Sequence, residues 1–204
     1  MIKNVVFDLG NVVLKLKWNI VIDRYAKEAD AKILQDIIFN SKEWIELDRG
    51  TLTKEEAIKI MLSKLPDRLH IPCKEIMKHW TDALVINEEI ITFIETIRAL
   101  GYKTYILSNA PLEIPPFLKN KDLEKYFDGK IISAEEKVSK PESQIYEILL
   151  ERFSLDSTEC LFIDDREDNI SAAIKCGLNG YVFDYNQFDK FLKDISKYLD
   201  ISEL

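Results

Sequence analysis

The chain has 204 residues, of which 47% are apolar and 31% are charged. This composition is typical of one packed domain, or of one domain carrying a smaller insertion, and it excludes a disordered chain. The net charge of -8 argues against a nucleic acid as partner, because an acidic protein repels a phosphate backbone. Three cysteines without paired spacing indicate neither disulfides nor zinc, and they favour a cytoplasmic location. We expect no membrane partner, since no apolar stretch is long enough to span a bilayer.

Short runs of consecutive apolar residues predict strands that are covered on both faces, as in a parallel sheet. The runs are residues 5–7, 104–107, 161–163 and 181–183, with residues 130–133 as a weaker fifth. The stronger runs all end in short polar side chains, which places those side chains where the strands end.

Helical patterns separate these runs in the C-terminal half of the chain. They cover residues 88–100, with Asn87 as the expected cap, residues 141–153, with Pro141 in the first turn, and residues 168–176. Strands that alternate with helices are typical of an α/β fold. We therefore expect an open parallel, Rossmann-like sheet with helices on its faces.

Residues 16–85 interrupt this alternation, because they contain almost no strand-like run. A capping box at residues 53–56 and Pro72 each begin a helical pattern. All three tryptophans lie in this stretch. The pattern predicts a helical domain, residues 16–85, inserted into an α/β core made of residues 1–15 and 86–204.

Residues that can bind metal and phosphate end three of the predicted strands. They are Asp8, the pair Ser108 and Asn109, and the pair Asp164 and Asp165. Because the carboxyl ends of parallel strands meet at one edge, we expect these side chains to lie together. Two carboxylates suffice for magnesium, which prefers oxygen ligands and keeps several waters, while a hydroxyl can hold phosphoryl oxygens.

Lys140, which precedes the helix expected at Pro141, can supply a positive charge to this edge. Its ammonium group can neutralise a phosphate as a point charge. The adjacent acids Asp164 and Asp165 repel each other unless a cation lies beside them, which also favours a metal site. Each of these residues alone is compatible with an ordinary structural role, and only their combination at strand ends indicates function.

The sequence resembles the haloacid dehalogenase-like hydrolases at four motifs that occur in the family's order. The motifs are Phe7-Asp8-Leu9-Gly10-Asn11-Val12, Leu107-Ser108-Asn109, Ser139-Lys140-Pro141-Glu142 and Ile163-Asp164-Asp165. The predicted helical insertion resembles the α-helical cap of this family, so the resemblance covers nearly the whole chain. The first motif, together with Asp48-Arg49-Gly50, is most similar to the sugar-phosphate phosphatases of the group, which include bacterial glucose-1-phosphate phosphatases.

The resemblance implies a magnesium-dependent hydrolysis of small phosphate esters, such as sugar phosphates, through an aspartyl-phosphate. Asp8 would be the nucleophile and a magnesium ligand, while Gly10 would give a backbone carbonyl and Asp165 a carboxylate to the same metal. Asp164 would orient Lys140 or a metal-bound water. The partner would be a small phosphorylated metabolite, bound by a chain that acts as a monomer or a homodimer.

The same resemblance gives roles to the residues that would bind the phosphoryl group. Ser108 and Asn109 would hold its oxygens, and Lys140 would neutralise its charge. Arg49 could reach the substrate from the cap, although solvation at the surface is the default for a lone arginine. We expect Asn169 to serve the N-terminus of the following helix, with a role behind the site as the alternative.

One position departs from many phosphatases of the family, which carry a second Asp two residues after the nucleophile. Gly10 stands at that position here, and a glycine cannot transfer a proton. Three explanations remain open. The substrate has a good leaving group, such as an anomeric sugar oxygen or an acyl phosphate. Alternatively, Asn11, Asp48 or a water replaces the acid, or the reaction needs no acid, as in dehalogenation at carbon.

Three classes of function follow from these alternatives. We rank a magnesium-dependent phosphatase first, a metal-free 2-haloacid dehalogenase acting at carbon second, and a non-catalytic protein that binds a phosphorylated metabolite third. Asp165, Lys140 and Gly10 together favour the first class over the second. The retained Asp8 argues against the third, because a site that only binds an anion has no need of a nucleophile.

Overall fold

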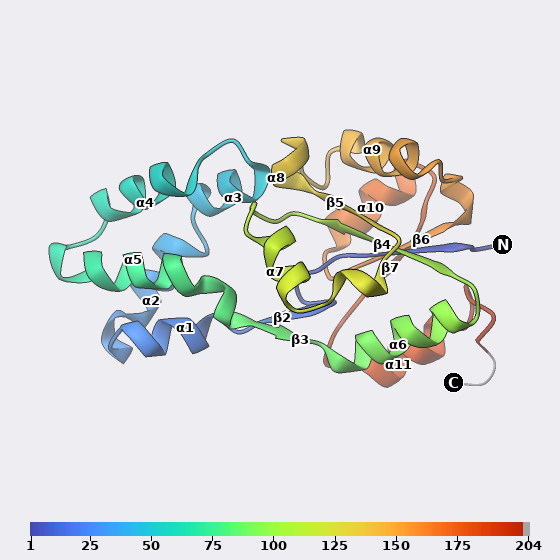
Figure 1. The fold of residues 1–204 in the computed structure, drawn as a ribbon, viewed down its shortest axis with the longest axis horizontal. Helices are drawn as coiled ribbons and strands as arrows, with labels where there is room; N and C mark the ends of the chain where they lie inside the picture. Colours follow the sequence, from blue (N-terminus) through green and yellow to red (C-terminus); the bar gives the residue numbers. More distant parts are fainter. Residues whose placement is uncertain (202–204) are drawn as a thin grey trace.

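A five-stranded parallel sheet forms the core of the protein in the computed structural model, which describes residues 1–201 (Figure 1). Its strands follow the order β5-β4-β1-β6-β7, and every neighbouring pair is parallel. All five predicted strands are present: β1 (Asn4–Phe7), β4 (Lys103–Ser108), β5 (Gly129–Ile132), β6 (Cys160–Asp164) and β7 (Asn179–Val182). The prediction of an α/β fold with an open parallel sheet is confirmed.

Helices connect the strands of this sheet. They are α6 (Glu88–Ala99), α7 (Ile114–Asn120), α8 (Ser133–Glu136), α9 (Ser143–Phe153), α10 (Glu167–Lys175) and α11 (Phe188–Ile195), with the short 3-10 turns η3 (Glu124–Tyr126) and η4 (Ser157–Glu159). None of the helices within residues 1–201 combines the length and the apolar character that crossing a bilayer requires.

The apolar residues of the strands alternate between two layers of helices. Val5 and Phe7 of β1 belong to the cluster that includes residues of α6 and α11 on one face of the sheet. Val6 points to the opposite face, where it joins residues of α9 and α10. Figure 1 shows these two pairs of helices on opposite sides of the sheet. Burial on both faces explains why the strands read as continuous apolar runs.

Two helix starts differ from the prediction. Helix α9 begins at Ser143, just beyond Pro141, and the Lys140-Pro141 peptide bond is cis. Asn87 precedes α6, but its side chain donates to the carbonyl of Val12 at 2.9 Å and does not cap the helix. The buried amide of Asn87 therefore ties the start of α6 to the loop that follows β1.

A helical segment, residues 18–83, is joined to the core by a second, two-stranded sheet (Figure 1). Strand β2 (Leu14–Leu16) leads into it and pairs in antiparallel fashion with β3 (Leu84–Ile86), which leads out. The sequence does not predict these strands, because three residues are too few for a periodic signal. Between them lie α1 (Trp18–Tyr25), α2 (Glu28–Ile38), α3 (Lys42–Arg49), α4 (Lys54–Ser63), η1 (Asp67–Leu69), α5 (His70–His79) and η2 (Trp80–Ala83).

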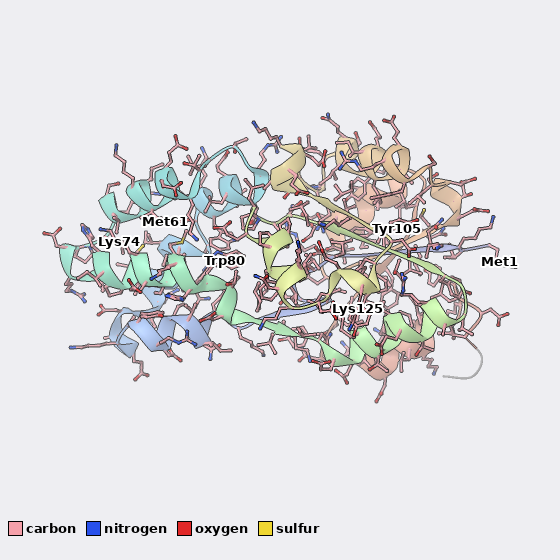
Figure 2. All side chains as sticks on the ribbon, in the orientation of Figure 1. Met1, Met61, Lys74, Trp80, Tyr105 and Lys125 are labelled. Atoms are coloured by element: carbon pink, nitrogen blue, oxygen red, sulfur yellow. The ribbon has the colours of Figure 1, made fainter. Side chains whose placement is uncertain are left out.

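The buried apolar residues of this segment are continuous with the cluster on one face of the sheet. Met61, labelled in Figure 2, is fully buried there together with Leu34 and Ile76. The predicted capping box is confirmed at the start of α4, because Thr53 accepts from the backbone N–H of Glu56 at 3.3 Å and Glu56 accepts from that of Thr53 at 2.9 Å. Local capping and shared burial together make this segment helical.

The end of α3 lies directly on the core at α8. Gly50 ends α3 with a left-handed φ of 74°, and a Cβ at this position would overlap the backbone of Ala134. The hydroxyl of Ser133 donates to the carbonyl of Asp48 and accepts from the N–H of Ala110 at 2.9 Å. The helical segment thus meets the core through a backbone contact that tolerates no side chain at Gly50.

We predict that Gly50→Ala destabilises the protein more than Gly101→Ala does. Both glycines end a helix with a positive φ, but the space around Gly101 is open. The left-handed backbone costs an alanine about 1 kcal/mol at either position, and the overlap with Ala134 adds about 1–3 kcal/mol at Gly50 alone. Urea unfolding of the two variants measures the difference. Equal losses in the free energy of unfolding would contradict the close contact between α3 and α8.

Candidate active site

The carboxyl ends of β1, β4 and β6 meet at one edge of the sheet, as the parallel topology predicts. Strand β1 lies between β4 and β6, so Asp8, Ser108 and Asp164 end three adjacent strands. All three side chains are buried. Carboxylate oxygens of Asp8, Asp164 and Asp165 lie within 4.8 Å of one another. The structure therefore brings together the acidic residues that the sequence places far apart.

The ammonium group of Lys140 lies at the centre of this cluster. Its Nζ atom is 2.9 Å from Asp8, 2.6 Å from Asp164 and 2.9 Å from the carbonyl oxygen of Leu107. These three acceptors match the three protons of an ammonium group. Burial by itself would lower the pKa of Lys140, but the two carboxylates raise it above its ordinary value. The lysine is therefore a fixed positive charge beside Asp8.

Asn109 fixes the backbone of Lys140 with both ends of its amide. Its Nδ2 donates to the carbonyl of Lys140 at 2.9 Å, and its Oδ1 accepts from the N–H of Lys140 at 2.8 Å. The sequence predicts phosphate binding for Asn109, and the structure adds a contact that the motif alone does not reveal. Because the pairing spans two separate loops, no local pattern could have indicated it.

Asp8 has one oxygen that is held and one that is not. Its Oδ1 accepts from Lys140 and from the N–H of Leu9 at 2.7 Å, whereas no hydrogen bond to Oδ2 is found within residues 1–201. Burial raises the pKa of Asp8 to about 7, and Lys140 opposes this rise. A nearby cation would favour the charged form, which is the form that can attack an electrophile.

The two adjacent acids, Asp164 and Asp165, have different surroundings. Asp164 accepts from Lys140, from the N–H of Arg166 at 2.8 Å and from the amide of Asn169, which is 3.0 Å from both oxygens. Those contacts occupy the lone pairs of both its oxygens. Asp165 accepts only from Asn11, at 3.0 Å, among the hydrogen bonds of the described chain. Asp165 therefore has oxygen lone pairs left for a metal, whereas Asp164 holds Lys140.

Magnesium fits this set of donors. The free oxygen of Asp8 and the free lone pairs of Asp165 are hard ligands of the kind that Mg²⁺ prefers, and two carboxylates are enough for it. Burial raises the pKa of Asp165, with the hydrogen bond from Asn11 opposing, and a cation beside this carboxyl group would favour its charged form. Gly10 follows Asp8 closely enough for its backbone to reach the same edge.

A cavity of about 80 Å³ lies between this edge and the helical segment. On the core side it is lined by Gly10, Ser108 and Asn109. The rest of its lining is mainly apolar, including Leu14, Leu16, Trp18, Trp44, Trp80, Leu84 and Ile114, together with Asp48. Figure 2 labels Trp80 where the helical segment meets the core. The cavity thus has a polar side, which the edge of the sheet forms, and a mainly apolar side that is rich in aromatic rings.

The tryptophans both pack together and form this wall. The ring of Trp44 lies edge-on to Trp18 at 5.8 Å and to Trp80 at 5.1 Å, and Trp18 stacks on Phe39 at 4.0 Å. The sequence favours packing over ligand stacking for Trp18 and Trp44. The structure shows the packing, and it also shows one side of the cluster facing the cavity.

Arg49 is not among the cavity residues within the described part of the chain. Its guanidinium group pairs with both carboxylate oxygens of Glu142, one of them at 2.9 Å. A second ion pair across the same boundary joins Lys54 to Glu113 at 2.9 Å. Both pairs are partly exposed to solvent. The structure thus places Arg49 at a contact between helical segment and core, and does not bring it to Asp8.

Comparison with known proteins identifies the family and the relatives that this chain resembles. The family model for the haloacid dehalogenase-like hydrolases matches residues 2–177. The chain is 26% identical over 184 residues to the sesquiterpene phosphatase astK of Aspergillus oryzae, covering 87% of this chain and 88% of that protein. It is 28% identical over 192 residues to D-ribitol-5-phosphate phosphatase of Bacteroides thetaiotaomicron, covering 89% and 91% of the two chains.

Solved structures show the same fold. An enzyme of the family from Bacteroides thetaiotaomicron, in complex with magnesium and inorganic phosphate, superimposes with a TM-score of 0.73 at 26% identity, covering 92% of this chain and 96% of that one. The similarity extends over the sheet and the helical segment alike, because nearly the whole of each chain is aligned. The chain therefore belongs to the haloacid dehalogenase-like hydrolase family, and the relatives to which it is similar include phosphatases.

Proposed function

We propose that the protein hydrolyses phosphate monoesters of small metabolites in a magnesium-dependent reaction through an aspartyl-phosphate on Asp8. The observation that carries the proposal is the pairing of Asp8 with Lys140 at 2.9 Å, which leaves the other oxygen of Asp8 without a hydrogen bond among residues 1–201. A carboxylate and a phosphate dianion repel each other, so attack requires fixed positive charge beside both. Lys140 is such a charge, and its two other contacts keep it in place.

Each residue of the edge has a part in this reaction. A carboxylate oxygen of Asp8 attacks phosphorus, and Ser108 donates its hydroxyl to a phosphoryl oxygen. Lys140 neutralises charge on the phosphoryl group, while Asp164 accepts from Lys140 and is itself held by the amide of Asn169. Asn109 acts on the phosphoryl group and also through the backbone of Lys140.

The metal site that we propose consists of Asp8, Asp165 and the backbone carbonyl of Gly10. Bound magnesium would withdraw charge from the phosphoryl oxygens and keep Asp8 ionised. The related enzyme from Bacteroides thetaiotaomicron binds magnesium and phosphate in its crystal structure, which supports the same requirement here. Asn11 holds Asp165 at 3.0 Å and would orient this ligand.

Sugar phosphates are the first substrates to test. The resemblance of the first motif to sugar-phosphate phosphatases and the similarity to D-ribitol-5-phosphate phosphatase support this class. The apolar wall of the cavity favours a second candidate, the phosphate of an apolar alcohol, and the similarity to a sesquiterpene phosphatase agrees with it. Tryptophan rings can stack on a sugar face or pack against an apolar chain, so both classes suit the wall.

The helical segment acts in this proposal as a cap, with the core formed by residues 1–15 and 86–204. Its wall of tryptophans covers the edge and would exclude water when a substrate is bound. We place the enzyme in the cytoplasm, where phosphorylated metabolites occur and its three free cysteines stay reduced. It would act there as a monomer or homodimer, without nucleic acid or membrane as partner.

We predict that Asp8→Asn abolishes magnesium-dependent release of phosphate from a panel of phosphorylated metabolites and aryl phosphates. The amide cannot attack phosphorus, so the loss should be at least about 10³-fold. Phosphate release with and without magnesium measures it. Asp36→Asn, which removes a carboxylate from the exposed face of α2, is the matched control and should retain native activity.

Three outcomes would contradict the proposed function. Release of phosphate that does not depend on magnesium or on Asp8 would assign the activity to another site. Release of halide from 2-haloacids without magnesium, in the absence of any phosphate release, would support the dehalogenase alternative instead. Binding of phosphate without turnover would support the binding-protein alternative.

We further predict that Asp164→Asn and Asp165→Asn have different effects. Asp165→Asn should raise the half-saturating magnesium concentration at least about tenfold, because a metal ligand loses its charge. Asp164→Asn should instead lower the free energy of unfolding by roughly 3 kcal/mol, because it leaves buried Lys140 short of one countercharge. Magnesium titration calorimetry and urea unfolding separate the two. The reverse assignment of the two effects would show that Asp164 is the ligand.

A further inference from the structure

Among residues 1–201, the edge of the sheet offers no acid beyond the carboxylates already assigned to the nucleophile, the metal and Lys140. Gly10 stands where a second Asp would transfer a proton, and all three protons of Lys140 are committed to Asp8, Asp164 and the carbonyl of Leu107. The amide of Asn11 donates to Asp165 and is in any case not an acid. A phosphate ester of an ordinary alcohol would therefore leave as an alkoxide, which is slow without a proton.

Asp48 lies on the opposite side of the same cavity. It belongs to the last turn of α3 and lines the cavity together with Gly10 and Ser108. No hydrogen bond to its carboxyl group is found within residues 1–201, whereas its backbone carbonyl accepts from Ser133. The backbone is thus fixed to the core, and the carboxyl group remains available to a ligand.

The contact of α3 with the core keeps Asp48 at the wall of the cavity that the helical segment contributes. An in-line attack by Asp8 drives the leaving oxygen away from the sheet and toward the helical segment. Asp48 stands on that wall, held by the contact of Gly50 with Ala134. The other wall residues contributed by the helical segment are Trp18, Trp44 and Trp80, whose rings carry no acidic proton.

We infer that Asp48 is the proton donor to the leaving group, in place of the acid missing at Gly10; this inference rests on the proposed function. The carboxyl group of Asp48 protonates the bridging oxygen as the bond between that oxygen and phosphorus breaks and the bond from Asp8 forms. The electron pair of the broken bond stays on the alcohol oxygen, and Asp48 becomes a carboxylate.

The second displacement restores both residues. Asp48 takes a proton from a water as the water oxygen attacks phosphorus, and the bond between phosphorus and Asp8 breaks with its electron pair returning to Asp8. Phosphate is released, and Asp48 is again a carboxylic acid. Burial, and next the charge of Asp8, raise the pKa of Asp48 well above its ordinary value, which favours its protonated form.

The test compares leaving groups of different acidity. Benzyl, phenyl and para-nitrophenyl phosphate form a series in which the leaving alcohol becomes steadily more acidic and needs a proton less. The value of kcat/KM reports on the steps up to formation of the aspartyl-phosphate, so it isolates the first displacement from the second. Native protein and variants are assayed with saturating magnesium.

We predict that Asp48→Asn lowers kcat/KM for benzyl phosphate by about 10²–10⁴-fold, and for para-nitrophenyl phosphate by less than about tenfold. Asp48→Glu keeps an acidic proton and should recover part of the loss on benzyl phosphate. Glu46→Gln, on the same helix but outside the cavity, is the matched control and should show native values on all three substrates.

The outcomes distinguish this inference from the proposed function. An equal loss of kcat/KM on all three substrates in Asp48→Asn, or no loss on benzyl phosphate, would overturn the role of Asp48. The phosphatase function would still be supported if the native protein hydrolyses para-nitrophenyl phosphate. Failure of the native protein to turn over any of the three would overturn both. If Asp48→Asn does not fold, Asp48→Glu provides the test through the ratio of kcat/KM for benzyl phosphate to kcat/KM for para-nitrophenyl phosphate. A lower ratio than in the native protein would support proton donation by Asp48. A native ratio would show that Asp48 has only a structural role.

Discussion

A single buried ammonium group organises the active edge of this protein. Lys140 is almost fully removed from solvent, and its charge is balanced by two carboxylates that end two different strands. Lys140 and its two carboxylates depend on one another, because a buried charge without its counterion destabilises the fold whereas a fully paired charge is tolerated. The positions of β1, β4, β6 and the loop before α9 are therefore coupled through one side chain. A phosphate ester that enters would find this charge already in place.

Much of this edge follows from the sequence, because the rule that governs it is simple. Buried strands read as apolar runs, parallel strands share a carboxyl edge, and the residues that end β1 and β6 are Asp8 and Asp164. The alternation of strands and helices predicts the parallel sheet in the same way, and the interruption of this alternation predicts the inserted helices. These features are local in sequence, or follow from topology alone.

Other features depend on contacts between distant segments and have no local signal. The hydrogen bonds of Asn109 to the backbone of Lys140 join two loops, and no spacing or composition reports them. The place of Asp48 in the cavity depends on how α3 lies on α8, which one missing Cβ at Gly50 permits. Arg49 belongs to the same motif as Asp48, yet it points to Glu142 outside the cavity. Asp48 and Arg49 are adjacent in sequence but have different surroundings, because the packing of α3 against the core determines where each side chain lies.

The short ribbon of β2 and β3 has a mechanical consequence. The chain enters the helical segment through β2 and leaves it through β3, so both covalent connections to the core lie side by side in this one pair of strands. A movement of the segment relative to the core would then be a rotation about the β2–β3 pair. Such a rotation would displace the contacts of Arg49 and Lys54 most. The two ion pairs there are partly exposed, and such pairs contribute about 0–1 kcal/mol each and weaken with salt. Ionic strength would therefore adjust how readily the cavity opens without altering the chemistry inside it.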